Sequence, residues 1–258
     1  MDYQSVINFY YRSNYGTFTE YLKNPGCDLA FSAYAEDPYF NHIVHYREAP
    51  KEILARYANE FSKRNRKPTL YLTPLSERYA SAPITGFTRY AEDSWMKRDP
   101  GARLRAQTAP EGLTIEAIGA REQSSYLSAF RKAFGNPNDI YGALPEGYCE
   151  AEKQFFQSPT GMTSHVILCK QQGDPIGVVR AVAEGPQAFI YALGVDPQHR
   201  RGGVVAGLVG DFITRRLLDA GVQDIYLQTE AGSPLERLYQ NAGFKRIFTG
   251  IYFVPAVA

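Results

Sequence analysis

The sequence has few cysteines, no long apolar run and almost no net charge. Its 258 residues include Cys27, Cys149 and Cys169, whose odd number and wide spacing predict no disulfide framework. No apolar run reaches the length that a membrane-spanning helix needs, and the N-terminus does not read as a basic-then-apolar leader, so we expect a cytoplasmic protein. The formal net charge of +1 predicts no bulk attraction to nucleic acid or to anionic membranes.

Several common functional motifs are also missing from the sequence. No Gly-Lys pair occurs, which excludes the triphosphate-binding loop, and the intervals from Gly202-Gly203 to Gly207 do not fit a dinucleotide-binding fingerprint. The sequence contains no Gly-x-Ser-x-Gly elbow, so serine hydrolase chemistry has no support. His42 and His45 are three residues apart, which in a strand places them on opposite faces, and we expect no metal site.

The most informative stretch lies between residues 189 and 212. An apolar run over 189–193 predicts a strand, and apolar residues recur at helical spacing after a two-glycine turn. The first N–H groups of a helix have no partner within the helix and carry partial positive charge. Gly202 and Gly203 allow a phosphate to approach them, and Arg200 and Arg201 add two charges. The stretch predicts a phosphate or pyrophosphate site, although an ordinary strand-to-helix turn also fits.

This turn resembles the signature of the GNAT superfamily of acyl-CoA-dependent N-acyltransferases, Val-x-Pro-x-x-Arg-x-x-Gly-x-Gly/Ala. Val195, Pro197, Arg200 and Gly203 match it, whereas Val205 stands where the family usually has Gly or Ala. The resemblance implies that the turn amides bind the pyrophosphate of coenzyme A, that acetyl-CoA is the acyl donor, and that no metal takes part. The cofactor-binding residues that we expect on this basis are Leu193, Gly194, Val195, Arg200, Arg201, Gly202, Gly203, Val204, Val205 and Ser233.

A second block, residues 233–244, is similar to a late helix of the same family. Ser233 is a suitable N-cap, Pro234 suits the first helical position, and Gly243 is a helix stop before Phe244. Ser233 replaces the usual Asn, so a hydrogen bond to the cofactor there would be weaker. By resemblance, Tyr239 protonates the leaving thiolate of coenzyme A, a role that suits a neutral phenol. A tyrosine packed under the sheet is the alternative.

The order of predicted elements supports a GNAT fold, an α/β fold with a mixed sheet. From about residue 113 we expect one strand, two helices, three strands, a helix, a strand, a helix and a final strand. The first half repeats a strand–helix–strand pattern from residue 41 but lacks the glycine turn. We therefore predict a degenerate GNAT-like domain over residues 1–110, which walls the acceptor groove, and an N-acetyltransferase domain over residues 111–258.

The resemblance implies direct transfer of an acetyl group to an amine. The strand that ends at residues 193–195 would pair with the pantetheine amides and stabilise the oxyanion through its N–H groups. A base must take a proton from the amine, and the candidates are Glu184, Glu150, Tyr191 and Glu230, of which we select Glu230.

Carboxylates alternate with aromatic side chains between residues 139 and 156, a composition that favours a cationic amine. We expect a small-molecule or amino-acid-like acceptor, neither nucleic acid nor membrane as partner, and a monomer or homodimer. The alternatives are a non-catalytic acyl-CoA sensor, an acetyltransferase that acts on proteins or peptides, and a structural protein that binds no cofactor.

Overall fold

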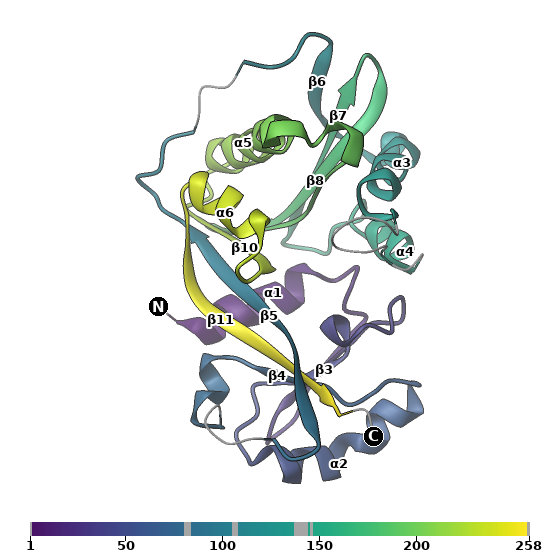
Figure 1. The fold of residues 1–258 in the computed structure, drawn as a ribbon, viewed down its shortest axis with the longest axis vertical. Helices are drawn as coiled ribbons and strands as arrows, with labels where there is room; N and C mark the ends of the chain where they lie inside the picture. The colour runs from purple at the N-terminus through teal and green to yellow at the C-terminus, as the bar shows by residue number, and fades with distance from the viewer. Residues whose placement is uncertain (1, 80–83, 105–107, 137–143, 145–146, 257–258) are drawn as a thin grey trace. The chain divides into compact units, whose positions relative to one another are not determined.

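A computed structural model describes residues 2–79, 84–104, 108–136, 144 and 147–256 (Figure 1). The chain forms two compact units. The first comprises residues 1–95, 229–232 and 246–258, and the second comprises residues 96–228 and 233–245. Within the described ranges, no helix combines the length and the apolar character that crossing a membrane requires. The predicted domains 1–110 and 111–258 stay a prediction.

The second unit is built on a mixed sheet whose strands lie in the order β10-β9-β8-β7-β6. β10 pairs parallel with β9, and the other neighbours pair antiparallel. The mixed α/β fold class predicted from the sequence is therefore confirmed. The bounds of these strands are Leu113–Ile118 for β6, Thr163–Gln171 for β7, Asp174–Glu184 for β8, Gln187–Val195 for β9 and Asp224–Glu230 for β10.

Helices cover both faces of this sheet. Figure 1 shows α3 (Gln123–Phe134) and α4 (Gly147–Gln154) on one side of β7 and β8, and α5 (Val204–Asp219) on the other. The short α6 (Pro234–Asn241) follows β10. Apolar residues recur at helical spacing on α5, so they form a stripe on one side of the helix, and this side packs on the sheet. The buried residues of this stripe are Val205, Val209, Ile213 and Leu217.

Alternate residues of the strands face the α3 and α4 side, as strand geometry requires. There Arg180 of β8 and Tyr191 of β9 meet residues of α4 and the segment after it. Gly194 of β9 has to be glycine, because a β-carbon at that position would lie 2.8 Å from the β-carbon of Ala133 at the end of α3. The end of β9 and the end of α3 are therefore in close contact.

The first unit contains a second group of strands in the order β1-β2-β3-β4-β11-β5. Its C-terminal strand β11 runs antiparallel to β4, with Tyr252 opposite Tyr71. The strand–helix–strand pattern predicted from residue 41 corresponds to β3, α2 and β4, whereas α1, β1 and β2 were not predicted. The bounds are Tyr3–Ser13 for α1, Glu20–Lys23 for β1, Asp28–Phe31 for β2, His42–Val44 for β3, Pro50–Lys63 for α2, Leu70–Leu72 for β4, Phe87–Arg98 for β5 and Phe244–Pro255 for β11.

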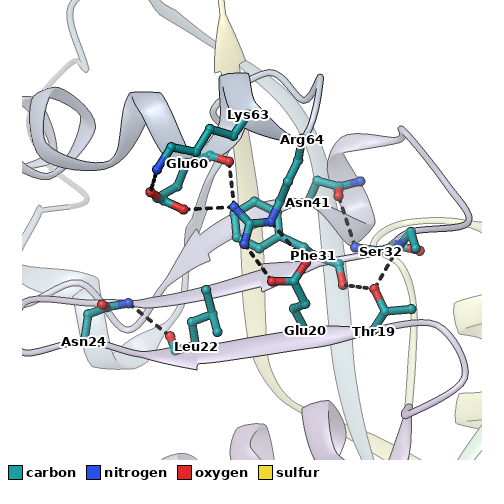
Figure 2. Close-up of polar contacts among 11 residues, drawn as sticks. Thr19, Glu20, Leu22, Asn24, Phe31, Ser32, Asn41, Glu60, Lys63 and Arg64 are labelled. Atoms are coloured by element: carbon teal, nitrogen blue, oxygen red, sulfur yellow. Dashed lines mark hydrogen bonds and ion pairs between the residues drawn. The ribbon is translucent and has the colours of Figure 1, made fainter.

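The basic residues between 63 and 67 lie at and just after the C-terminal end of α2. Arg64 binds Glu20 of β1 through its Nε and Nη2 atoms, at 3.1 and 2.6 Å, and Glu60 of α2 through Nη1 at 2.9 Å (Figure 2). Its guanidinium also lies 4.4 Å from the ring centre of Phe31. The side chain therefore joins α2 to β1 and β2 within the first unit.

Buried aromatic and polar side chains fill the interior of the first unit. The hydroxyl of Tyr11 lies 2.6 Å from Nε2 of His42, and the Tyr71 ring stacks on Tyr252 with ring centres 4.1 Å apart. Burial lowers the pKa of His42 to about 4 and that of His45 to about 3. Both imidazoles are therefore neutral in the folded protein near pH 7.

The described residues contain no group of three side chains suited to holding a metal ion.

Candidate functional site

The site begins with an irregularity in β9. Val178 of β8 pairs with Gly194, whereas Arg180 pairs with Tyr191, so β9 carries one extra residue between these pairs. Ala192, inside this bulge, has a φ of 52°, which is rare for a residue with a side chain. The parallel register of β9 with β10 ends at the Ile190–Leu227 pair. Beyond that pair, the β10-facing edge of β9 is suited to hydrogen bonds with an extended ligand.

The predicted glycine turn follows β9 directly. Asp196 caps a short 3-10 turn, Pro197–His199, by accepting a hydrogen bond of 3.0 Å from the N–H of Gln198. Gly202 and Gly203 both have a φ of 68°, a left-handed conformation that glycine adopts without a steric penalty. Gly203 is the N-cap of α5 and has no side chain to accept from the first amides of the helix. Those amides are therefore positioned for an anion.

A cavity of about 610 Å³ extends from this turn between α5 and α6. Its wall includes the α5 side of β9 and β10, at Ile190 and Leu227, and successive turns of α5 at Gly207 and Gly210. The structure brings five of the predicted site residues together in the wall of this cavity, namely Leu193, Gly202, Gly203, Val204 and Tyr239.

The structure describes the side-chain contacts of Arg200 but only the backbone of Arg201. Arg200 donates from Nε to the carbonyl of Val195 at 2.7 Å and from Nη2 to the carbonyl of Ala133 at 2.6 Å. Its side chain therefore ties the end of β9 to the end of α3. The backbone of Arg201 belongs to a 3-10 turn that ends at Gly203, and its side chain lies outside the described part of the chain.

Val205 and Ser233, the two departures from the family pattern, both have a structural role. Val205 is 7% exposed and packs in the core with Val209, so its side chain is not part of the cavity wall. The hydroxyl of Ser233 accepts from the N–H of Glu236 at 3.2 Å and caps α6, as its sequence position predicts. Their roles in cofactor binding stay predictions, as do those of Gly194 and Val195.

Tyr239 lies on α6, half-buried, and its ring meets the edge of Phe244 with centres 6.0 Å apart. Because it lines the same cavity as the glycine turn, a ligand that spans the cavity can contact both. Glu230, the predicted base, is exposed at the end of β10 and belongs to the first compact unit, whereas Tyr239 belongs to the second. The role of Glu230 therefore stays a prediction.

The carboxylates expected near the acceptor are engaged within the protein. Glu152 is buried and accepts two hydrogen bonds from Nε of Arg180, at 3.0 and 2.9 Å, and one from the hydroxyl of Tyr126 at 2.7 Å. Arg180 in turn lies 3.3 Å from the ring centre of Phe155. The charge of Glu152 is therefore balanced within the protein by a buried ion pair. Glu150 pairs with Lys153 on the surface of α4.

Four other residues of the expected acceptor segment, Asp139, Ile140, Tyr141 and Glu146, lie outside the described residues. Of the other base candidates, Tyr191 is 9% exposed and stacks on Phe189, with ring centres 4.9 Å apart. Its phenol is therefore part of the packed face of the sheet.

Sequence analysis missed two charged residues of the cavity wall, Asp211 and Arg237. Helical spacing from the glycine turn could have identified Asp211 as a residue of the cavity wall. It follows Gly207 by four residues on α5, and Gly207 follows Gly203 by four, so all three share one side of the helix. Arg237 precedes Leu238 on α6, and no motif assigns it a role.

Comparisons with known proteins agree with this geometry. The sequence model of the acetyltransferase (GNAT) family matches residues 128–244. A mycothiol acetyltransferase from Thermobispora bispora is 28% identical over 171 residues, which are 62% of this chain and 56% of that protein. The chain thus spans about half the length of this curated relative.

Solved structures show the same fold over nearly the whole chain. A GCN5-related N-acetyltransferase from Kribbella flavida has a TM-score of 0.65 at 15% identity and covers 98% of this chain and 95% of its own. A tandem GNAT protein from the clavulanic acid biosynthesis pathway has a TM-score of 0.62 at 13% identity, over 90% and 79% of the two chains. Residues 128–244 thus match the acetyltransferase (GNAT) family, and the chain as a whole has the fold of these GNAT-related structures.

Proposed function

We propose that the protein transfers the acetyl group of acetyl-CoA to the amine of a small-molecule or amino-acid-like acceptor. The observation that carries the proposal is that the glycine turn at residues 202–203 and Tyr239 line one cavity beside the bulge of β9. The first amides of α5 suit the pyrophosphate, the edge of β9 suits the pantetheine amides, and the phenol suits the sulfur.

The proposed reaction is a direct attack by a neutral amine on the thioester carbonyl carbon. The new C–N bond forms as the carbonyl π bond opens, and N–H groups of β9 stabilise the oxyanion. When the carbonyl re-forms, the C–S bond breaks and the thiolate takes a proton from Tyr239. The amine nitrogen gives its extra proton to a base, for which Glu230 is our candidate.

A small acceptor is favoured over a protein tail by one comparison. The curated relative from Thermobispora bispora is named a mycothiol acetyltransferase, after a small molecule and not after a protein. The geometry of Glu152, in contrast, removes one of the carboxylates that favoured a cationic acceptor, because its charge is balanced by Arg180. The acceptor class therefore depends on the acyl-transfer fold and this relative rather than on a charged acceptor pocket.

The non-catalytic sensor is the second candidate, and the structure removes its main support. That reading depended on Val205 and Ser233 as signs of lost turnover. Val205 instead completes the core under α5, and Ser233 caps α6, so both residues have another reason to be present. An enzyme that retains Tyr239 in its cofactor cavity is the better account.

Release of free thiol from acetyl-CoA tests the proposal. The protein is incubated with acetyl-CoA and a panel of small amines, amino acids and peptides, and acylated products are identified by mass spectrometry. We expect thiol release that depends on a small amine, with the product heavier by one acetyl group. Acylation of peptides alone would mean that the acceptor is a protein or peptide and not a small molecule. Binding of coenzyme A without turnover across the panel would favour the non-catalytic sensor. Succinyl-CoA and longer acyl-CoA donors, run in parallel, define the acyl preference.

A further inference from the structure

Arg200, the arginine of the family signature, uses its guanidinium to hold main-chain carbonyls. Its bonds to Val195 and Ala133 are 2.7 and 2.6 Å long and engage both Nε and Nη2. Arg200 is not among the residues that line the cavity. The cationic charge of this side chain therefore fixes the β9–α3 junction, and the cavity itself needs another cation if it binds a strongly anionic ligand.

Arg237 is a cation in the cavity wall. It is exposed, it lies in the first turn of α6, and among the described residues no ion pair or side-chain hydrogen bond occupies its guanidinium. The next residue, Leu238, contacts the glycine turn, since its Cδ1 would be 3.5 Å from a β-carbon placed on Gly203. Arg237 therefore lies on the part of α6 that adjoins the anion-binding amides of α5.

The chemistry of the position suits phosphate. Coenzyme A carries a pyrophosphate and a 3′-phosphate, and backbone amides offer only partial charge to these groups. An arginine can bind a phosphate through two parallel N–H bonds, and the N-terminal turn of α6 adds partial positive charge beside it. The only other charged residue among the described residues that line the cavity is Asp211, further along α5, and a carboxylate does not bind phosphate.

We propose that Arg237, the cation among the described residues of the cavity wall, is a side chain that binds the phosphate groups of coenzyme A, an inference that rests on the proposed function. Arg200 then acts on the site only by holding the end of β9. Arg237 is a binding residue in this proposal, and the chemical step stays with Tyr239 and the base.

Calorimetric titration of the whole protein with coenzyme A tests this assignment without knowledge of the acceptor. We expect Arg237→Ala to weaken binding about 10-fold, the loss typical of one charge-assisted hydrogen bond. Arg237→Lys should retain part of the affinity, because it keeps the charge without the two-bond geometry. The matched control is Arg215→Ala, which removes an exposed arginine of α5 that does not line the cavity and should leave the dissociation constant unchanged.

Two further measurements sharpen the result. Raising the salt concentration should narrow the difference between the wild type and Arg237→Ala, since exposed charges are screened. Titration with 3′-dephospho-coenzyme A identifies which phosphate Arg237 binds. If Arg237→Ala still weakens the binding of this ligand, the arginine binds the pyrophosphate. If the wild type and Arg237→Ala bind it equally well, the arginine binds the 3′-phosphate. Equal affinity of wild type and Arg237→Ala for coenzyme A overturns the inference and leaves the proposed function standing. Failure of the wild type to bind coenzyme A overturns the proposed function itself.

Discussion

Gly203 lies against Leu238, so closely that a β-carbon on Gly203 would be 3.5 Å from Cδ1 of the leucine. This contact joins the two sequence blocks that resemble the GNAT family, the glycine turn and the helix of Tyr239. It also places the N-terminus of α5 beside α6 at the cavity. The position of Tyr239 relative to the turn is therefore set by packing within one compact unit.

Replacement of Gly203 with Ala should weaken coenzyme A binding. At a φ of 68°, a side chain costs about 1 kcal/mol of stability, and any relaxation of the turn moves the amides that we expect to bind the pyrophosphate. We expect at least a tenfold higher dissociation constant by calorimetry. The control is Gly221→Ala, which has a φ of 85° at the other end of α5 and open space around it. It should lose similar stability and no affinity, and equal affinities of the two variants would contradict the site.

Replacement of Tyr239 with Phe should lower turnover and spare cofactor binding. The substitution keeps the ring that packs on Phe244 and removes only the proton donor. General acid catalysis contributes at least about 100-fold, so we expect kcat to fall by about that factor in the thiol-release assay. Tyr90→Phe, at an exposed tyrosine of the first unit, serves as the control. Unchanged kcat in Tyr239→Phe would show that another group protonates the thiolate.

Val205→Ala separates packing from phosphate binding. Val205 is 7% exposed in the core, so the loss of two methyl groups should lower the free energy of unfolding by about 2 kcal/mol. Its side chain does not line the cavity, and we expect the dissociation constant for coenzyme A to stay within twofold of the wild type. Urea unfolding and calorimetry measure the two quantities. A clear gain in affinity would mean that the valine does crowd the phosphates.

The Glu152–Arg180 pair should contribute to stability far more than the surface pair on the same helix. Glu152→Gln leaves the buried Arg180 without its counter-charge, which should lower the free energy of unfolding by about 3 kcal/mol or more. Glu150→Gln breaks only the exposed contact to Lys153, worth under about 1 kcal/mol. Urea unfolding of both variants measures the difference. Similar losses would show that Glu152 is not the buried partner of Arg180.

The first unit should lose stability in mild acid through its buried histidines. The folded pKa of His42 is about 4 and that of His45 about 3, both below the ordinary value of 6.5 because burial disfavours the charged ring. At a pH between the folded pKa and the ordinary value of 6.5, the unfolded chain binds more protons than the folded one. The contribution of each histidine to the free energy of unfolding is therefore fully present above pH 6.5 and is lost as the pH falls toward the folded pKa. The slope approaches about 1.4 kcal/mol per pH unit for each histidine.

His45→Asn tests this pH dependence. Asparagine tolerates the φ of 55° at this position and does not titrate, so the variant should show a shallower loss of stability between pH 7 and pH 5 than the wild type. Urea unfolding at several pH values gives the slope, and the comparison cancels the contribution of carboxylates. An identical slope in both proteins would mean that His45 is not buried as a neutral ring.

Sequence reasoning reached the elements of the second unit because their signals are local. Helical spacing, the two glycines and the Ser-Pro start of α6 each act over a few residues, and the helices and strands formed where these signals lay. Two of the missed elements of the first unit, β1 and β2, are only four residues long and so give little periodic signal. α1 does carry a helical pattern, because its buried residues are mostly apolar or aromatic, namely Val6, Ile7, Phe9, Tyr10, Tyr11 and Ser13.

Long-range partners are what the sequence could not supply. Arg200 carries the charge expected of a phosphate ligand, but the carbonyl that it binds at Ala133 lies 67 residues earlier. Glu152 fits an acceptor site by composition, yet its partner Arg180 lies across the unit on β8. In both cases the side chain satisfies a buried polar group, and such pairing follows from tertiary packing rather than from local pattern.

A crystal structure of the protein saturated with coenzyme A tests the central claim most directly. We expect the pyrophosphate oxygens within hydrogen-bond distance of the first amides of α5 after Gly203, with the sulfur next to the hydroxyl of Tyr239. Coenzyme A bound elsewhere on the protein, or this cavity empty at saturating concentration, would contradict the account.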